Sequence, residues 1–406
     1  MRVPKPRSRF ASRLALGVAA VLALRCGSNP PASERVPFTP TSDEVVLEQV
    51  PATAGDARAR ERASLRRALS AKPEQLDLAL RLARLDIEES RMRGDPRYLG
   101  RAQAALAPWW DASSPPPGVR LLRATILQSR HGFPAALADL DVAVREDPRN
   151  AQAWLTRAVV LGVRGQHAEA TASCAPLSAL AGPLTAAVCE AQVKSLAGRS
   201  REAFALLTDA LARGAPGPEA EAWALSTLAE AAARAGDTAR AEKLFVRTLA
   251  MDPGDAYTRA AFADLLLDSN RPREAAALVR GHSEDDNQLL RLVLAETALG
   301  SNEAATLTAE LAERYAASHL RGDGLHAREE ARFALHVEKA PGKALTLARA
   351  SWDVQREPWD ARLLMETALA AGKPEAAAPV LEHLRASGCE DPGLVALMER
   401  LRRSLP

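Results

Sequence analysis

The chain has 406 residues and a formal net charge of +2. Alanine accounts for 85 residues, isoleucine for only two, and aromatic residues for 4% of the chain. Because this composition favours helices over pleated strands, it excludes a β-sandwich or a β-barrel. With 47% hydrophobic and 26% charged residues, the chain has the balance of a globular protein.

Residues 1–26 differ from the rest of the chain in charge and hydropathy. They carry six cations and no acidic residue, so they contribute +6 and leave −4 for the remainder. A basic start followed by the apolar run Leu14–Leu24 is typical of a bacterial secretion signal, and this run is too short to cross a bilayer comfortably. The near-neutral body has no electrostatic footprint for nucleic acid, so we expect no nucleic-acid partner.

The end of this leader, Leu22–Cys26 (LALRC), resembles the lipobox of bacterial lipoproteins, in which the cysteine becomes the lipidated first residue. It departs from that pattern at Arg25, where the family has a small residue. Cys26 is therefore a lipidation candidate, with a cleaved soluble protein and an uncleaved N-terminal membrane anchor as alternatives. All three predict an exported protein of the cell envelope, in the periplasm or attached to a membrane. A cytosolic protein with an apolar N-terminus is the remaining alternative.

Residues 27–54 are rich in proline, serine and threonine and have no period, so we expect a disordered tether. Beyond them, three segments share one arrangement: a helical stretch, a glycine-containing turn, a second helical stretch and a closing proline. These segments are Ala124–Pro148, Trp154–Pro183 and Leu225–Pro253. The closing prolines Pro148 and Pro183 are 35 residues apart. Self-similarity at a fixed period of this length indicates a repeat architecture.

This pattern resembles the tetratricopeptide repeat (TPR), a helix–turn–helix unit with small residues at positions 8 and 20 and glycine near position 15. In the unit that begins at Ala222 these positions fall on Ala229, Ala241 and Gly236. Small residues let the two helices approach closely where they cross, and glycine can adopt the left-handed conformation that ends a helix. A later unit departs from the pattern, because Arg332 falls on the first small position.

The resemblance implies an all-α, right-handed α-solenoid of about eight helix–turn–helix units. It would occupy residues 55–406, with the clearest repeats in 117–283. We expect extra helices at 55–71 and 391–403, because the end repeats of a solenoid must cover their apolar faces.

The resemblance also implies a concave groove, lined by positions 2, 5, 9 and 12 of each first helix, that binds extended peptides or partner helices. Tryptophan and tyrosine with scattered charges suit recognition of a protein. Packing between repeats is the alternative explanation for each aromatic residue taken singly. The groove positions are Leu155, Val159, Trp223, Ser226, Glu230, Tyr257, Asp264, His326, Glu329, Phe333, His336, Trp359, Arg362 and Glu366.

His326, Glu329 and His336 share one helix face, which raises the question of a metal site. The two histidines are ten residues apart, about 15 Å along a helix, so one metal ion cannot bridge them. We therefore predict no metal, no cofactor and no catalytic residue, and keep a metal-binding or enzymatic protein only as a remote alternative. The other histidines, including His167 and His383, lie at turns or helix ends and are expected to be solvated.

Cys174 and Cys189 fall on helices of successive units that pack together. An oxidising compartment would allow a disulfide between them, closing a loop worth about 3 kcal/mol in the chain-entropy model. Two buried free thiols are the alternative.

The sequence thus predicts a non-enzymatic scaffold that binds a protein partner at or near the cell envelope. An accessory lipoprotein for assembly of an envelope polymer or a secretion machine is the alternative that the sequence leaves open.

Overall fold

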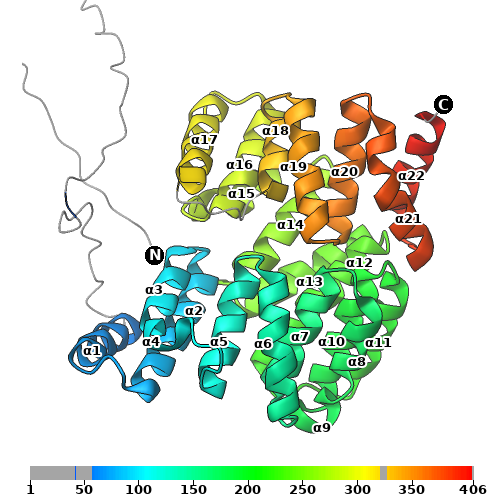
Figure 1. The fold of residues 1–406 in the computed structure, drawn as a ribbon. Helices are drawn as coiled ribbons and strands as arrows, with labels where there is room; N and C mark the ends of the chain where they lie inside the picture. Colours follow the sequence, from blue (N-terminus) through cyan, green and yellow to red (C-terminus); the bar gives the residue numbers. More distant parts are fainter. Residues whose placement is uncertain (1–41, 43–56, 321–326, 405–406) are drawn as a thin grey trace, which may run out of the picture. The chain divides into compact units, whose positions relative to one another are not determined.

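In a computed structural model of the chain, the described residues are Ser42, 57–320 and 327–404. The predicted leader with Cys26, nearly all of the predicted tether, and His326 lie outside them. Contacts divide the chain into two units, Met1–Ala54 and Gly55–Pro406, and the second contains every described helix. The described residues form 22 α-helices and two short 3-10 segments, and no strand (Figure 1). None of the described helices is long and apolar enough to cross a lipid bilayer.

The helices pair into nine antiparallel hairpins within the described residues, where the sequence predicts about eight. The predicted all-α solenoid is confirmed. The hairpins are α2 (Leu76–Arg93) with α3 (Arg97–Ala105), α5 (Pro117–Ser129) with α6 (Phe133–Glu146), α7 (Ala151–Val163) with α8 (His167–Cys174), α10 (Pro183–Leu196) with α11 (Ser200–Ala212), α12 (Pro218–Arg234) with α13 (Thr238–Met251), α14 (Ala256–Asp268) with α15 (Pro272–Val279), α16 (Asp286–Leu299) with α17 (Ala304–Leu320), α18 (Ala327–His336) with α19 (Pro341–Val354), and α20 (Pro358–Ala370) with α21 (Ala378–Ser387).

Further helices stand at the two ends of the array and between hairpins. The end helices are α1 (Ala57–Ala71) and α22 (Pro392–Ser404), where the sequence predicts covering helices. The short segments are α4 (Ala107–Trp110), α9 (Leu177–Ala181), η1 (Arg280–His282) and η2 (Pro374–Ala377).

Alanine at the helix crossings allows the close approach within each hairpin. Ala229 and Ala241 in the α12–α13 hairpin are fully buried, as are Ala263 and Ala275 in α14–α15. Gly236 lies in the middle of the turn of the first pair, with a φ of 85°, a left-handed conformation that suits glycine. The small positions therefore lie where the repeat pattern places them.

The α18 hairpin explains the departure at Arg332. Its turn has four residues, 337–340, whereas the α12–α13 and α14–α15 turns have three. The small residue lies five positions before the end of the first helix in α12 and α14, and the same count in α18 reaches Ala331, which is fully buried. The inserted turn residue shifts the predicted positions on this helix by one, so Arg328 and Arg332 take the places predicted for Glu329 and Phe333. Glu329 still lines the larger inner cavity described below, whereas Phe333 does not.

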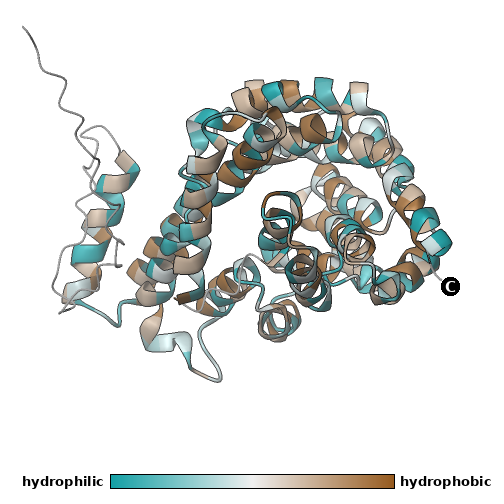
Figure 2. Ribbon diagram, turned by 90° about the horizontal axis from the view of Figure 1, so that it is seen from above, coloured by the Kyte–Doolittle hydropathy of each residue, from teal (hydrophilic) through white to brown (hydrophobic). Residues whose placement is uncertain are grey.

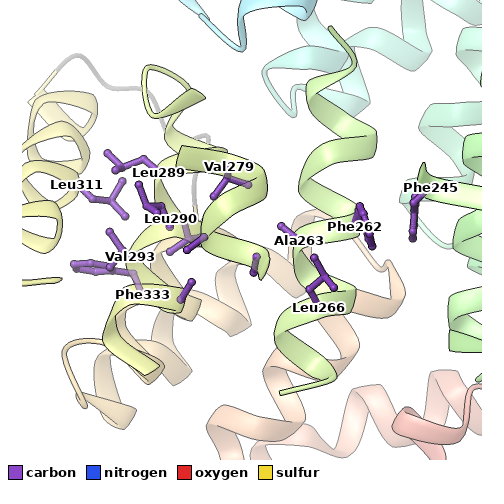
Figure 3. Close-up of a cluster of buried hydrophobic side chains, with 14 of the residues drawn as sticks. Phe245, Phe262, Ala263, Leu266, Val279, Leu289, Leu290, Val293, Leu311 and Phe333 are labelled. Carbon is purple, nitrogen blue, oxygen red and sulfur yellow. The ribbon is translucent and has the colours of Figure 1, made fainter. Parts of the chain in front are cut away.

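Phe333 accordingly belongs to the core and not to a groove, which corrects the sequence prediction. It is 3% exposed and contacts the ring of Tyr315 edge-on, with 5.7 Å between centroids. Figure 3 shows it beside Val293 and Leu311, among side chains of the largest apolar cluster. Burying a phenylalanine of this kind stabilises the fold by about 2–3 kcal/mol.

The C-terminal hairpins pack back on the third and fourth hairpins, which begin with α7 and α10. The N–H of Arg356 donates to the carbonyl of Val163 at 2.7 Å, and the N–H of Glu390 donates to the carbonyl of Gly198 at 2.9 Å. The helices of this unit follow a curved path (Figure 2), and these two bonds tie the segments after α19 and α21 to the ends of α7 and α10. The array is therefore joined to itself by backbone contacts between distant repeats.

Inner cavities as the candidate functional site

Two adjoining cavities lie along the inward-facing first helices, and we call them the inner cavities. The larger has a volume of about 570 Å³ and the smaller about 500 Å³. Helices α12, α14 and α20 contribute to the wall between them. The residues that line both cavities are Glu230, Arg234, Ala261, Asp264, Pro358 and Trp359.

Eight of the predicted groove residues line these cavities. Tyr257 is the most accessible aromatic among them, with 63% of its surface exposed. The structure thus brings together side chains from five first helices, although they are far apart in the sequence. The predicted groove residues that line the larger cavity are Val159, Glu230, Tyr257, Asp264, Glu329 and Trp359. The two that line only the smaller cavity are Arg362 and Glu366.

The other predicted groove residues have different surroundings. Leu155 and Trp223 pack, half-buried, against the apolar clusters of neighbouring repeats. Ser226 is buried and its hydroxyl lies 2.6 Å from that of Thr258. His336 is exposed and its Nε2 lies 3.9 Å from a carboxylate oxygen of Glu366, outside both cavities.

Asp264 is the centre of a buried ion network in the cavity wall. One of its oxygens accepts from Arg291 at 2.6 Å and the other from Arg332 at 2.8 Å. Burial alone would raise the pKa of Asp264, but the two guanidinium groups outweigh it and the pKa is lowered. Asp264 is therefore ionised and positions both arginines.

Trp359 lies between two arginines. The guanidinium carbon of Arg332 is 4.5 Å from the Trp359 ring centroid, and that of Arg362 is 4.7 Å away. Arg362 in turn donates twice to Asp268 on α14, at 2.6 and 2.8 Å. Cation–π contacts of this kind fix the orientation of the indole, so Trp359 is a rigid part of the wall.

A second network holds α18 against α20. Arg328 donates to both oxygens of Asp360, at 2.9 and 2.5 Å, and also to Glu357. Ser351 donates to the same carboxylate at 2.7 Å. Burial raises the pKa of Asp360, opposed by the charge of Arg328. The sequence prediction missed Arg328 and Arg332, although the length of the following turn carried the signal.

Comparison with known proteins identifies the repeats. The tetratricopeptide-repeat family profile matches residues 232–296, which include the end of α12, all of α13, α14 and α15, and most of α16. The chain contains tetratricopeptide repeats. No curated protein sequence matches the chain.

Three solved structures are similar to parts or most of the chain. A thermophilic TPR protein of Thermus thermophilus is 21% identical, with a TM-score of 0.37. The match covers 47% of this chain and 97% of the Thermus chain. PilW, a type IV pilus biogenesis factor, is 20% identical, with a TM-score of 0.39. This match covers 49% of this chain and 93% of the PilW chain. The human IFIT1 dimer with PPP-AAAA is 14% identical, with a TM-score of 0.44. This match covers 85% of this chain and 88% of the IFIT1 chain. At these identities the likenesses concern the fold alone.

The cysteines of two successive helical hairpins are joined. Cys174 and Cys189 form a disulfide, with their Cα atoms 5.7 Å apart. Both are buried, and Cys189 also lines the larger inner cavity. The bond connects α8 to α10 directly behind the cavity wall.

Two histidines that the sequence predicts to be solvated are half-buried. The rings of His167 on α8 and His383 on α21 lie 5.8 Å apart, and His383 also contacts Trp352 edge-on at 5.4 Å. Burial, with the charges of His383 and Arg199 as smaller causes, lowers the pKa of His167 to about 4. The N-terminal and C-terminal repeats cover these rings where they meet, which periodicity within one repeat does not reveal.

The described part of the TPR array holds no group of three or more histidine, cysteine or acidic side chains placed to bind a metal ion. Its inner charges are instead taken up by arginine–carboxylate pairs. The walls of the inner cavities therefore consist of aromatic side chains and paired charged groups, whose contacts hold the walls in one arrangement.

Proposed function

We propose that this protein is a non-enzymatic scaffold that binds an extended segment of a partner protein in the inner cavities. TPR arrays serve in general as surfaces for protein–protein interaction, and the repeats of this chain support such a role. The observation that carries the proposal is Tyr257, an aromatic side chain that is 63% exposed and yet lines an inner cavity. Exposed aromatic residues in concave sites bury large areas on binding.

The arrangement of the cavities suits an extended segment, because the two cavities adjoin and share part of their lining. An extended chain can pass from one to the other along their shared wall of Glu230, Asp264 and Trp359.

The wall chemistry favours a segment without a strong net charge. Asp264 is paired with Arg291 and Arg332, and Arg328 is paired with Asp360. Because these charges already have partners, a ligand with many like charges would have to break existing ion pairs. A segment with apolar and hydrogen-bonding side chains would not.

Placement at the cell envelope is the second part of the proposal, and it rests on the basic and apolar leader that ends at Cys26. The test is fractionation of cells that express the wild type and a Cys26→Ala variant. We expect the wild type in the membrane fraction and the variant released from it. Recovery of both in the cytosol would contradict export, and equal membrane retention would contradict lipidation.

The binding site is tested with a photoreactive amino acid in place of Tyr257, followed by mass spectrometry of the crosslinked products. The same amino acid in place of Val246, which is 54% exposed on α13 and lines neither cavity, is the control. We expect one dominant protein adduct when the photoreactive residue is at position 257. That adduct should be absent when the residue is at position 246. The same adducts from both positions would show that the inner cavities are not the binding surface.

A further inference from the structure

We propose that a second surface of this protein, the groove lined by α1, α2, α3 and α4, binds an acidic segment of a partner protein. The groove has a volume of about 370 Å³ and shares no lining residue with the inner cavities. The proposal therefore does not depend on the function assigned to those cavities. It would give the scaffold two separate binding surfaces.

The floor of the groove is apolar and its edges are basic. Leu69, Leu82 and Ala105 form part of the floor and are 8%, 2% and 6% exposed. The charged lining residues are Arg66 on α1 and Arg101 on α3, and no acidic residue lines the groove. This sign is shared by the surrounding region, because residues 57–110 carry twelve cations and seven acidic residues, a net charge of +5.

Both arginines are exposed, and among the described residues no carboxylate lies within 4.0 Å of either guanidinium. Burial raises the pKa of Asp86, and the charges of both arginines oppose this only from beyond that distance, so their N–H groups remain accessible to a ligand. Their neighbour Arg62, by contrast, is buried and pairs with Glu89 at 2.9 Å. Arg101 is held in place by Tyr98, whose ring centroid is 4.6 Å from the guanidinium carbon. A preorganised arginine of this kind forms strong charge-assisted hydrogen bonds with carboxylates.

The shape of the groove favours a protein segment over a membrane surface. Leu69 and Leu82 lie at the bottom of a hollow, so they cannot enter a bilayer, whereas a helix that binds membranes projects its apolar side chains outward. A protruding apolar side chain of a partner can reach this floor while neighbouring carboxylates meet Arg66 and Arg101. The complementary ligand is thus an acidic segment with interspersed apolar residues.

The test measures fluorescence anisotropy of a fluorescein-labelled peptide of alternating leucine and glutamate, with its leucine–lysine counterpart as the control peptide. The full-length protein is compared with the double variant Arg66→Glu, Arg101→Glu. We expect at least about a tenfold loss of affinity in the double variant, because two charge-assisted contacts become repulsive. Arg60→Glu is the matched control, since Arg60 is exposed on the same helix and does not line the groove.

Several outcomes would overturn the proposal. Equal binding of the glutamate and lysine peptides would show that charge does not select the ligand. Unchanged affinity in the double variant would place the peptide elsewhere, and loss of binding in a Tyr257→Ala variant would place it in the inner cavities. Cosedimentation with phosphatidylglycerol vesicles that requires both arginines, without peptide binding, would make a membrane the occupant. Thermal melts followed by circular dichroism confirm that each variant folds.

Discussion

Arg332 on α18 donates a hydrogen bond to Asp264 on α14 at 2.8 Å, although 68 residues separate them in the chain. Asp264 also pairs with Arg291, and all three side chains are at most 10% exposed. Removing the charge of Asp264 would leave two buried arginines without their common partner, which costs about 3–5 kcal/mol. We therefore expect Asp264→Asn to lower the free energy of unfolding by that amount in urea titrations.

The control for this change is Asp268→Asn, one helical turn away on α14. Asp268 pairs with Arg362, but both side chains are more exposed, at 41% and 32%. Exposed ion pairs contribute about 0–1 kcal/mol, so the control variant should unfold near the wild-type midpoint. Equal losses in the two variants would refute the central role of Asp264.

Acid should weaken the contact between the N-terminal and C-terminal repeats through His167. Its pKa is lowered from 6.5 to about 4 by burial, so the folded protein favours the neutral imidazole. The stabilisation is complete above pH 6.5 and is lost as the pH falls from 6.5 towards 4, because the unfolded chain then binds the proton more readily. Allowing for partial exposure, this amounts to about 2 kcal/mol.

The measurement is the unfolding free energy of wild type and His167→Gln between pH 7.5 and 4. We expect the variant to lose less stability over this range. His282→Gln, at the end of η1, serves as the control and should follow the wild type. Parallel curves for wild type and His167→Gln would mean that this histidine does not contribute.

Alanine substitutions at two glycines distinguish two ways in which a side chain can lower the free energy of unfolding. One is strain in the backbone conformation, and the other is a clash between distant repeats. Gly198 has φ of +84°, and a Cβ there would lie 2.8 Å from the Cα of Cys389. Gly300 has φ of +63°, with no atom within 4 Å of a Cβ. Gly300→Ala should therefore cost about 1–2 kcal/mol for the left-handed conformation alone.

Gly198→Ala should cost more, because the methyl group meets backbone that cannot move without breaking the Glu390–Gly198 hydrogen bond. Faster hydrogen exchange at Glu390 in this variant, but not in Gly300→Ala, would locate the effect at the contact. Similar exchange in both variants would show that the contact is absent in solution.

The Cys174–Cys189 bond is tested by counting thiols in unfolded protein before and after reduction. We expect two additional thiols after reduction, since the two cysteines are joined. Closing a loop of 15 residues is worth about 3 kcal/mol in the chain-entropy model, so reduction should lower stability by about that much. Equal thiol counts would establish the alternative of two buried free thiols.

The sequence predicts the repeat well because its signals are local. Ala229, Gly236 and Ala241 lie within one hairpin, where fixed spacing has a direct steric meaning. The same spacing fails at α18, where one additional turn residue moves Phe333 into the core and Arg332 to the inward face. Repeat positions that are assigned by a constant spacing are wrong wherever a turn contains an extra residue. The length of each turn must therefore be known before the positions are assigned.

The contacts between distant repeats could not be predicted from the same pattern. His167 meets His383, and Arg332 meets Asp264, only because small rotations between successive repeats add up over several units. Each rotation depends on the packing of individual side chains. The sequence therefore predicts which residues face inward better than it predicts what they contact.

The backbone bonds from Arg356 to Val163 and from Glu390 to Gly198 change how the array can come apart. In an open solenoid each repeat touches only its neighbours, so the terminal repeats fray first and stability is a sum along one dimension. Here α20 to α22 cannot fray without also exposing the turns that follow α7 and α10. The C-terminal repeats and the middle of the chain should consequently unfold as one cooperative unit, and removing α22 should weaken hydrogen-exchange protection in α10 as well as in its own neighbours.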